Sequence, residues 1–162
     1  MAISQQVRRS RKDLSACWID YKKAYDSVPH AWLMRVLELY KVDITLRTFL
    51  LSCMGTWRTV LRYPGCRRTR GSSEPIRIER GIFQCDSLSP LWFCLALNPL
   101  STLLEGSGLG YRLKRGGQVI SHLLYMDDLK LFAPSKLQLM ELTLLVVPSG
   151  WNLVWTNVQS CM

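Results

Sequence analysis

The sequence predicts a single α+β domain, in which an antiparallel sheet carries helices on one face and is open on the other. Two observations support this fold class. The chain has the patterns of a strand, helices, a hairpin, a helix, a second hairpin and a last helix in that order. Its 162 residues are also enough for one domain with a substantial apolar core.

The first part of the chain predicts a strand, a turn and a helix. Residues 14–19 form a β-like run that ends at Asp20, and residues 21–26 form a turn. From His30 onward, apolar residues recur at the spacing of an amphipathic helix. The apolar face of this helix would consist of Leu33, Val36, Leu37 and Tyr40.

A second helix and a hairpin should follow. Asp43 is suited to cap the next helix, which Gly55 would end. The inward side chains of that helix would be Leu46, Phe49, Leu50 and Cys53. Residues 56–63 and 76–80 have the pattern of strands and are separated by a Pro-Gly turn and a loop rich in Arg and Ser. We expect these two strands to pair as a hairpin.

The second half of the chain predicts a buried helix, further antiparallel strands and a last helix. Ser89-Pro90 suits a helix start, because serine can cap and proline is tolerated at the first helical position. The apolar run that follows reaches Leu104. Strands are expected across residues 110–115 and 119–133, and the final helix across residues 136–147.

Two adjacent carboxylates lie at the tip of a predicted hairpin. Asp127 and Asp128 separate the β-like runs 120–124 and 129–133. If the strand that ends at Asp20 lies beside this hairpin in one sheet, Asp20 and Asp127 meet. An Asp-Asp pair in a turn is by itself ordinary, because aspartate bonds its own backbone there.

A cluster of carboxylates is nevertheless what nucleotidyl transfer requires. In this reaction an oxygen displaces pyrophosphate in line at phosphorus, and two divalent cations about 3.5–4 Å apart can stabilise the attacking and leaving oxygens together. Mg2+ prefers hard oxygen ligands, and it usually takes one or two carboxylates plus substrate phosphates.

Three segments resemble the palm motifs of reverse transcriptases. Residues 19–30 resemble the first motif, in which a metal-binding Asp precedes an aromatic residue by five positions. Residues 81–90 are similar to the second motif, and Tyr125-Met126-Asp127-Asp128 is similar to the third. The residues of the first motif resemble those of the non-LTR (LINE-like) retrotransposon branch rather than those of retroviruses, over the run Ala24-Tyr25-Asp26-Ser27-Val28-Pro29-His30. The resemblance covers about residues 10–147 and implies a polymerase palm.

The resemblance implies roles for individual residues of the first and third motifs. Asp20 and Asp127 would bind the metal ions and carry the catalysis, with Asp128 as the supporting carboxylate of the same metal site. Tyr25 would lie under the incoming sugar and exclude a 2′-hydroxyl, the group that separates RNA precursors from DNA precursors.

Three residues near the second motif match substrate-binding positions of the family. Gln84 matches a residue beside the incoming nucleotide. Cys85 stands where the family normally has Gly, which lets the backbone approach the substrate closely. Pro90 matches a position that helps grip the template strand.

The resemblance also implies a cofactor and partners. These are two Mg2+ ions, which Mn2+ could replace, together with an RNA template, a DNA primer and deoxynucleoside triphosphates. The net charge of +9 suits a polyanionic partner, although charge alone does not separate nucleic acid from an acidic membrane surface.

No apolar run approaches the ~18–20 residues of a membrane helix, and the basic start lacks the features of a secretory signal. We therefore expect no membrane partner and an intracellular location, in the nucleus or the cytoplasm.

A cluster of arginines precedes the second motif. Its members are Arg58, Arg62, Arg67, Arg68, Arg70, Arg77 and Arg80. Arginines on the open side would neutralise template or primer phosphates, so that binding would weaken as salt increases. For residues 67–70 a solvated loop is an equally good interpretation.

The two ends of the chain depart from the family pattern. Only 19 residues precede Asp20, so the basic fingers region would be largely missing, and so would the thumb. Residues 148–162 form a divergent tail, with Ser160 near the position where the family has a Lys suited to protonating pyrophosphate. We expect one partial reverse transcriptase domain across residues 1–162, with its palm core at about 13–147, from a truncated element copy.

Two other interpretations remain open beside an RNA-directed DNA polymerase palm. The fold could persist without the chemistry, as a retrotransposon remnant that acts at most as a basic nucleic-acid-binding module, and the missing fingers and thumb favour this. An RNA-directed RNA polymerase shares the palm but usually has Gly-Asp-Asp at the hairpin. Tyr125-Met126 and Tyr25 argue against that second alternative.

Overall fold

The computed structural model describes residues 13–63, 71–83, 87–113 and 117–146, and the backbone of residues 153–161. The helices of this part are α2 (Ala24–Ser27), α3 (His30–Leu39), α4 (Ile44–Thr56), α5 (Ser89–Gly106) and α6 (Lys136–Val146). The longer strands are β1 (Leu14–Tyr21), β8 (His122–Tyr125), β9 (Asp128–Ala133) and β10 (Leu153–Cys161). Two-residue strands are β2 (Arg58–Thr59), β3 (Arg62–Tyr63), β4 (Gly71–Ser72), β5 (Ile76–Arg77), β6 (Tyr111–Arg112) and β7 (Val119–Ile120).

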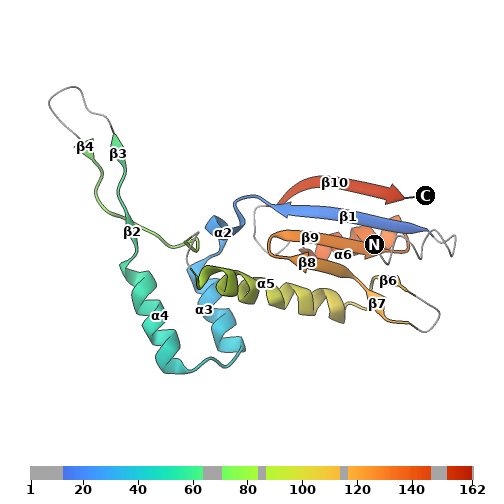
Figure 1. Cartoon of the computed structure of the whole chain (residues 1–162), viewed down its shortest axis with the longest axis horizontal. Coiled ribbons are helices and arrows are strands. Elements are labelled where there is room, and N and C mark those ends of the chain that lie inside the picture. Colours follow the sequence, from blue (N-terminus) through green and yellow to red (C-terminus); the bar gives the residue numbers. More distant parts are fainter. Residues whose placement is uncertain (1–12, 64–70, 84–86, 114–116, 147–152, 162) are drawn as a thin grey trace.

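The main sheet has the strand order β10-β1-β9-β8, and all neighbouring strands are antiparallel (Figure 1). The predicted antiparallel sheet is therefore confirmed, and the strand that carries Asp20 does lie beside the hairpin formed by β8 and β9. The tail, for which the sequence suggested only divergence, contributes β10 along the outer side of β1, with Leu14 opposite Cys161 and Tyr21 opposite Leu153.

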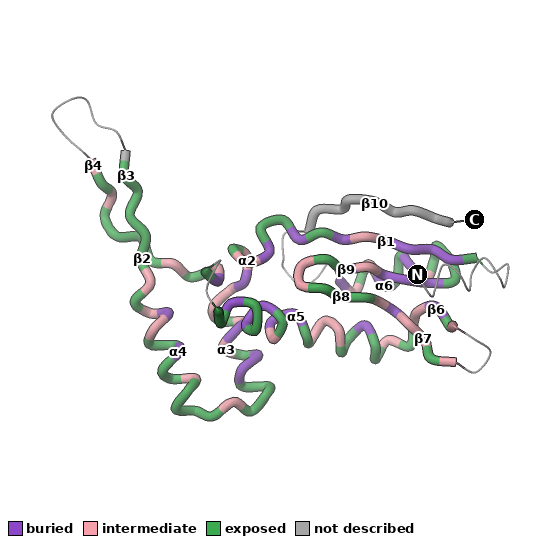
Figure 2. The backbone as a smooth tube through the Cα atoms, in the orientation of Figure 1, coloured by how far each residue is buried: buried purple, intermediate pink, exposed green. Residues whose placement is uncertain are grey.

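One face of this sheet is covered by helices, as predicted. Alternate residues of β1, among them Cys17, Ile19 and Tyr21, belong to the main core together with Leu129 and Leu131 of β9. Successive side chains of a strand point to opposite faces, so these residues share one face. They pack with buried residues of α3, α5 and α6, and Figure 2 shows the buried positions gathered along these elements.

Among the residues that the structure describes, the opposite face is covered at one end only. Leu14 and Ala16 of β1 and Phe132 of β9 form a second small core with Tyr111 of β6. Gly110 permits this close approach of β6 and β7. Its φ is +142°, and an added Cβ would lie 2.8 Å from backbone atoms of Ile120, so a side chain there would need both strands to move.

The early turn and the first helix differ from the prediction in detail. Residues 21–26 were expected to turn, but β1 continues to Tyr21 and a one-turn helix follows at Ala24–Ser27. The predicted amphipathic helix is present as α3, with its buried side made by Leu33, Val36 and Leu37. Tyr40 was wrongly placed on that side, because it is the C-cap and its side chain is exposed.

Helix α4 begins as predicted but buries only part of the predicted face. The Asp43 side chain caps it by accepting a hydrogen bond from the Thr45 backbone N–H at 2.8 Å. Leu46 and Phe49 were expected inward, yet they are 48% and 62% exposed, whereas Leu50 and Met54 are buried. The reason is that α4 runs away from the sheet (Figure 1) and meets the core along a narrow line only.

The predicted end of α4 at Gly55 was also wrong. The helix includes this residue and ends at Thr56. The Arg58 side chain donates hydrogen bonds to the backbone carbonyls of Gly55 and Trp57 at 2.7 and 2.8 Å. A side chain therefore supplies the capping interaction that a glycine conformation would otherwise provide.

The predicted hairpin after α4 is confirmed. Strand β2 pairs with β5, and β3 pairs with β4, while the predicted Pro64-Gly65 turn lies outside the described residues.

Helix α5 is buried along one side, through residues such as Trp92, Phe93 and Ala96, but Leu91 and Leu103 on its other side are exposed. Within the described part of the chain, none of the helices has the length and apolar character needed to cross a membrane.

Candidate active site

Two carboxylates face each other across the centre of the main sheet. Asp20 of β1 is the direct partner of Asp128, the first residue of β9. Directly opposed residues of an antiparallel pair have Cβ atoms about 5 Å apart and point to the same face. The preceding pair, Ile19 and Leu129, is buried under the helices, so Asp20 and Asp128 lie on the opposite, exposed face.

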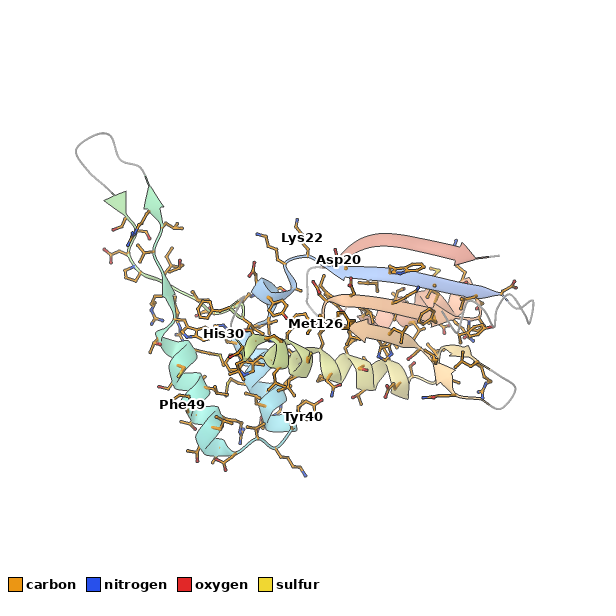
Figure 3. All side chains as sticks on the ribbon, viewed as in Figure 1. Asp20, Lys22, His30, Tyr40, Phe49 and Met126 are labelled. Carbon is orange, nitrogen blue, oxygen red and sulfur yellow. The ribbon has the colours of Figure 1, made fainter. Side chains whose placement is uncertain are left out.

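Asp127 occupies the adjacent turn. Tyr125 of β8 is the partner of Asp128, so the hairpin closes through Met126 and Asp127 alone. The register therefore places Asp128, rather than Asp127, directly opposite Asp20. Figure 3 shows Asp20 and the hairpin tip with Met126 at the same end of the sheet.

Met126 has an unusual backbone conformation at this tip. Its φ is +52°, in the left-handed region that costs a non-glycine residue about 1–2 kcal/mol. Two contacts with its sulfur hold it there. The Tyr25 hydroxyl and the Cys94 thiol each donate to Met126 Sδ at 3.9 Å. The conformation of the carboxylate turn is therefore coupled to α2 and to α5.

Tyr25 belongs to the same cluster as the carboxylate turn. Its ring stacks on Phe93 of α5, with ring centroids 4.6 Å apart and an angle of 10° between the planes. Partial burial raises the pKa of its hydroxyl, and the neighbouring Cys94 and Asp127 raise it further. The ring is thus fixed by a core aromatic on one side and by the hairpin tip at its hydroxyl end.

The segment after Tyr25 is joined to the start of the second motif. The Gly81 N–H donates to Val28 O at 2.8 Å, and the Ile82 N–H donates to Tyr25 O at 2.9 Å. The His30 ring donates from Nε2 to Gly81 O at 2.8 Å. Gly81 has a φ of +95° and lies against the backbone of Asp26, so an added Cβ would be only 3.3 Å away.

A half-buried histidine connects β8 to α5 behind the hairpin tip. His122 bonds through Nε2 to the Ser101 hydroxyl at 2.7 Å and through Nδ1 to the Ser121 hydroxyl at 2.9 Å. Burial lowers the pKa of this histidine, and the negative charge of Glu105 opposes the effect. The strand that leads to the carboxylates is therefore tied to α5 through the His122 ring.

The remaining predicted site residues have mixed outcomes. Gln84 and Cys85 lie outside the described residues. Pro90 is exposed in the first turn of α5, and its role stays a prediction. The predicted serine cap was wrong, because Leu88 occupies the N-cap position and Ser89 is inside the helix with its hydroxyl buried.

The donor set fits Mg2+ or Mn2+, although it is small. Among the described residues there is no group of three or more His, Cys, Asp and Glu side chains arranged to hold a metal ion. Mg2+ does not require such a group, since one or two carboxylates with substrate phosphates and waters complete its octahedron. Asp20 and Asp128, opposed on an exposed face with Asp127 beside them, offer hard oxygen donors of this kind.

The roles of Met126, Cys94 and Gly81 were not predicted from the sequence. Met126 and Cys94 are far apart in the chain and give no periodic signal, so nothing local indicates their contact. The sequence did offer a hint of the role of Gly81, because a glycine at the start of a motif often marks a backbone conformation that other residues rarely adopt. Its neighbour in space, Asp26, could not be identified from the sequence.

Comparison with known sequences identifies the family of this chain. Residues 2–149 match the reverse transcriptase (RNA-dependent DNA polymerase) family. The chain is 32% identical over 136 residues to a Pol polyprotein from a type-1 retrotransposable element R2 of Nasonia vitripennis, covering 83% of this chain and 12% of that protein. It is 30% identical over 139 residues to the polyprotein of element R2DM from Drosophila melanogaster, covering 84% of this chain and 12% of that protein.

A further R2 polyprotein, from Popillia japonica, is 29% identical over 147 residues, which are 90% of this chain and 20% of that protein. The chain thus spans about an eighth to a fifth of the length of these relatives.

Solved structures show the same fold. A truncated apo telomerase from Candida tropicalis superposes with a TM-score of 0.60 at 13% identity, covering 98% of this chain and 33% of that protein. Telomerase from Candida albicans, solved with a fragment of telomeric RNA, gives a TM-score of 0.51 at 14% identity, covering 96% of this chain and 29% of that protein. The predicted palm-like fold is confirmed by these superpositions. With its family match, its R2 relatives and this fold, the chain belongs to the reverse transcriptases of the non-LTR retrotransposon branch.

Proposed function

We propose that the chain is the palm of a non-LTR retrotransposon reverse transcriptase and carries the metal-binding carboxylates of RNA-directed DNA synthesis. The observation that supports this most is the pairing of β1 with β9, which brings Asp20 beside the Asp127-Asp128 turn. Family membership supports this type of reaction, and the pairing of β1 with β9 supports its location on an exposed face of the sheet.

In this proposal Asp20, Asp127 and Asp128 hold two Mg2+ ions, or Mn2+ in their place. When bound, the ions stabilise charge on the attacking and leaving oxygens during in-line displacement of pyrophosphate. The three carboxylates hold the donor oxygens in position on β1 and the β8–β9 hairpin. The fixed turn at Met126 sets the direction in which Asp127 presents its oxygen atoms.

The substrate residues have separate roles in the same proposal. Tyr25, fixed between Phe93 and Met126, lies under the incoming sugar and leaves no space for a 2′-hydroxyl. Gln84 lies beside the incoming nucleotide, and Pro90, exposed at the start of α5, contacts the template strand. Cys85 replaces the family glycine and reduces the space available to the nucleotide.

The partners are an RNA template, a DNA primer and deoxynucleoside triphosphates, inside the cell. The chain matches about an eighth to a fifth of the length of its R2 relatives. Groups that hold the triphosphate and the primer would then belong to other parts of a complete enzyme.

Metal binding by the chain itself tests this proposal without any turnover. We expect Mn2+ titrated into the protein and followed by electron paramagnetic resonance to bind the wild type, and Asp127→Asn to weaken that binding by tenfold or more. Loss of a residue that only orients a metal ligand already costs about 10–100-fold in affinity.

The matched control for this titration is Asp26→Asn. Asp26 is exposed in α2, six residues beyond Asp20 and outside the sheet. The Asp26→Asn variant should leave the Mn2+ affinity unchanged. Equal Mn2+ affinity in the wild type and in Asp127→Asn would overturn the metal assignment.

A further inference from the structure

A two-stranded arm leaves the end of α4 and extends away from the main sheet (Figure 1). We define the arm as residues 57–63 and 71–78. Strand β2 pairs with β5, and β3 pairs with β4. Backbone hydrogen bonds continue the ribbon, from Ser73 N–H to Leu61 O at 2.9 Å and from Ile78 N–H to Trp57 O at 3.2 Å.

The arm is fixed to the body at its base. The Trp57 ring lies against His30, Phe83 and Trp92, with ring centroids 5.2, 4.5 and 6.3 Å away. Beyond this base, Val60, Leu61 and Ile76 are all exposed. A two-stranded ribbon without a packed face is only marginally stable in water, so this part of the arm is suited to being covered by a partner.

Much of the positive charge of the chain is concentrated in and beside the arm. Residues 57–80 contain seven arginines and two glutamates, while the whole chain has a net charge of +9. All the basic residues of this segment are arginine, the side chain whose planar fork matches phosphate geometry. The arginines that the structure describes, Arg58, Arg62, Arg77 and Arg80, are exposed.

Two of these arginines oppose each other in the ribbon. Arg58 and Arg77 are direct partners between β2 and β5, and like charges in such positions destabilise a strand pair. The only described carboxylate near Arg77 is Glu79, at 3.9 Å and largely exposed, so it compensates little. An anion bound beside the Arg77 guanidinium would offset this repulsion.

We propose that the arm binds double-stranded DNA by entering the major groove and contacting backbone phosphates through Arg62 and Arg77. The major groove of B-form DNA, about 12 Å wide, admits a two-stranded β-ribbon. The deep, narrow major groove of A-form RNA does not admit protein side chains. The contact lies outside the carboxylate site, so it adds sequence-independent affinity for a duplex and takes no part in the chemistry.

The test is duplex binding measured by fluorescence anisotropy at several salt concentrations, in a chelating buffer without nucleotides so that catalysis plays no part. The probes are a DNA duplex, an RNA duplex of the same sequence and the single DNA strand. We expect the DNA duplex to bind most tightly. In the R62Q/R77Q double variant, the slope of log K against log salt should fall by about 1.8, since each phosphate contact contributes about 0.9.

The matched control is the R35Q/R112Q double variant, which removes the same charge from exposed arginines on α3 and β6. It should keep the wild-type slope. A Lys pair at positions 62 and 77 should retain most of the affinity, because lysine still binds phosphate as a point charge, and thermal melting checks that each variant is folded.

Three outcomes would overturn the proposal. The first is an equal loss of slope in the two Gln double variants, which would indicate a diffuse charge effect. The second is binding of the RNA duplex or the single strand as tightly as the DNA duplex. The third is loss of vesicle binding, rather than DNA binding, in R62Q/R77Q when vesicles of an anionic phospholipid are titrated, which would identify the arm as a membrane contact.

Discussion

At the scale of single residues, the site depends on how Tyr25 and the Met126 turn hold each other. Tyr25 is placed by Phe93 on its ring face and by the Met126 sulfur at its hydroxyl. Met126 in turn keeps a left-handed conformation next to Asp127. A change in either side chain therefore alters both the proposed sugar contact and the position of a proposed metal ligand.

We predict that Tyr25→Ala admits ribonucleotides, because removing the ring opens the space where the 2′-hydroxyl would lie. The measurement is incorporation of ribonucleotides against deoxyribonucleotides by the palm joined to the fingers and thumb of an R2 relative. Tyr25→Phe is the control, since it keeps the ring and the stacking and loses only the contact with Met126. Unchanged discrimination in Tyr25→Ala would make Tyr25 a core residue without a gating role.

At the scale of elements, α3 and α4 show how differently two apolar helices can be used. Helix α3 buries Leu33 and Leu37 in the main core, and Val36 is buried beside them on the same helix. Helix α4 keeps Phe49 and Leu51 exposed and leads into the arm. The first helix stabilises the sheet platform, whereas the second carries the arm away from it.

We predict that Leu33→Ala lowers the free energy of unfolding by about 2–5 kcal/mol, the usual cost of removing a fully buried leucine side chain. Leu33 has no exposed surface, while Leu39 on the same helix is 55% exposed. Leu39→Ala should therefore change stability by no more than about 0.5 kcal/mol. Urea denaturation of both variants is the measurement, and similar losses for the two would contradict the packing of α3.

At the scale of the whole molecule, the proposed site consists of three carboxylates, and turnover would also need groups that hold the triphosphate and the primer. Phosphoryl transfer depends almost entirely on positioning and charge stabilisation. The chain corresponds to about an eighth to a fifth of its R2 relatives, whose remaining length can carry such groups. Metal ligands alone would then be insufficient for turnover.

We predict that the 162-residue chain extends a DNA primer on an RNA template barely or not at all. A chimera with the fingers and thumb of an R2 relative should extend the primer, and Asp127→Asn in that chimera should abolish extension. Cys85→Gly should raise activity in the chimera and leave the 162-residue chain inactive, because it restores space for a nucleotide without supplying groups that hold the triphosphate and the primer. Robust extension by the unmodified chain would show that those groups are dispensable.

The sequence alone determined the features that depend on local patterns. The periodicity and chemistry of neighbouring residues predicted four such features. These are the strand of residues 14–19, the amphipathic helix from His30, the Asp43 cap and the hairpin with carboxylates at its tip. The three motifs also identified the reverse transcriptase family. These signals are local because strand alternation, helical spacing and capping each involve residues a few positions apart.

The tertiary structure decided which residues meet over long separations. It placed Asp128 rather than Asp127 opposite Asp20, because register follows from the packing of a whole buried face. It exposed Leu46 and Phe49, because α4 leaves the body along a line that its own apolar pattern does not specify. It also brought Cys94 and Tyr25 to the sulfur of Met126. Such contacts are decided by the packing of the assembled core, which no segment encodes by itself.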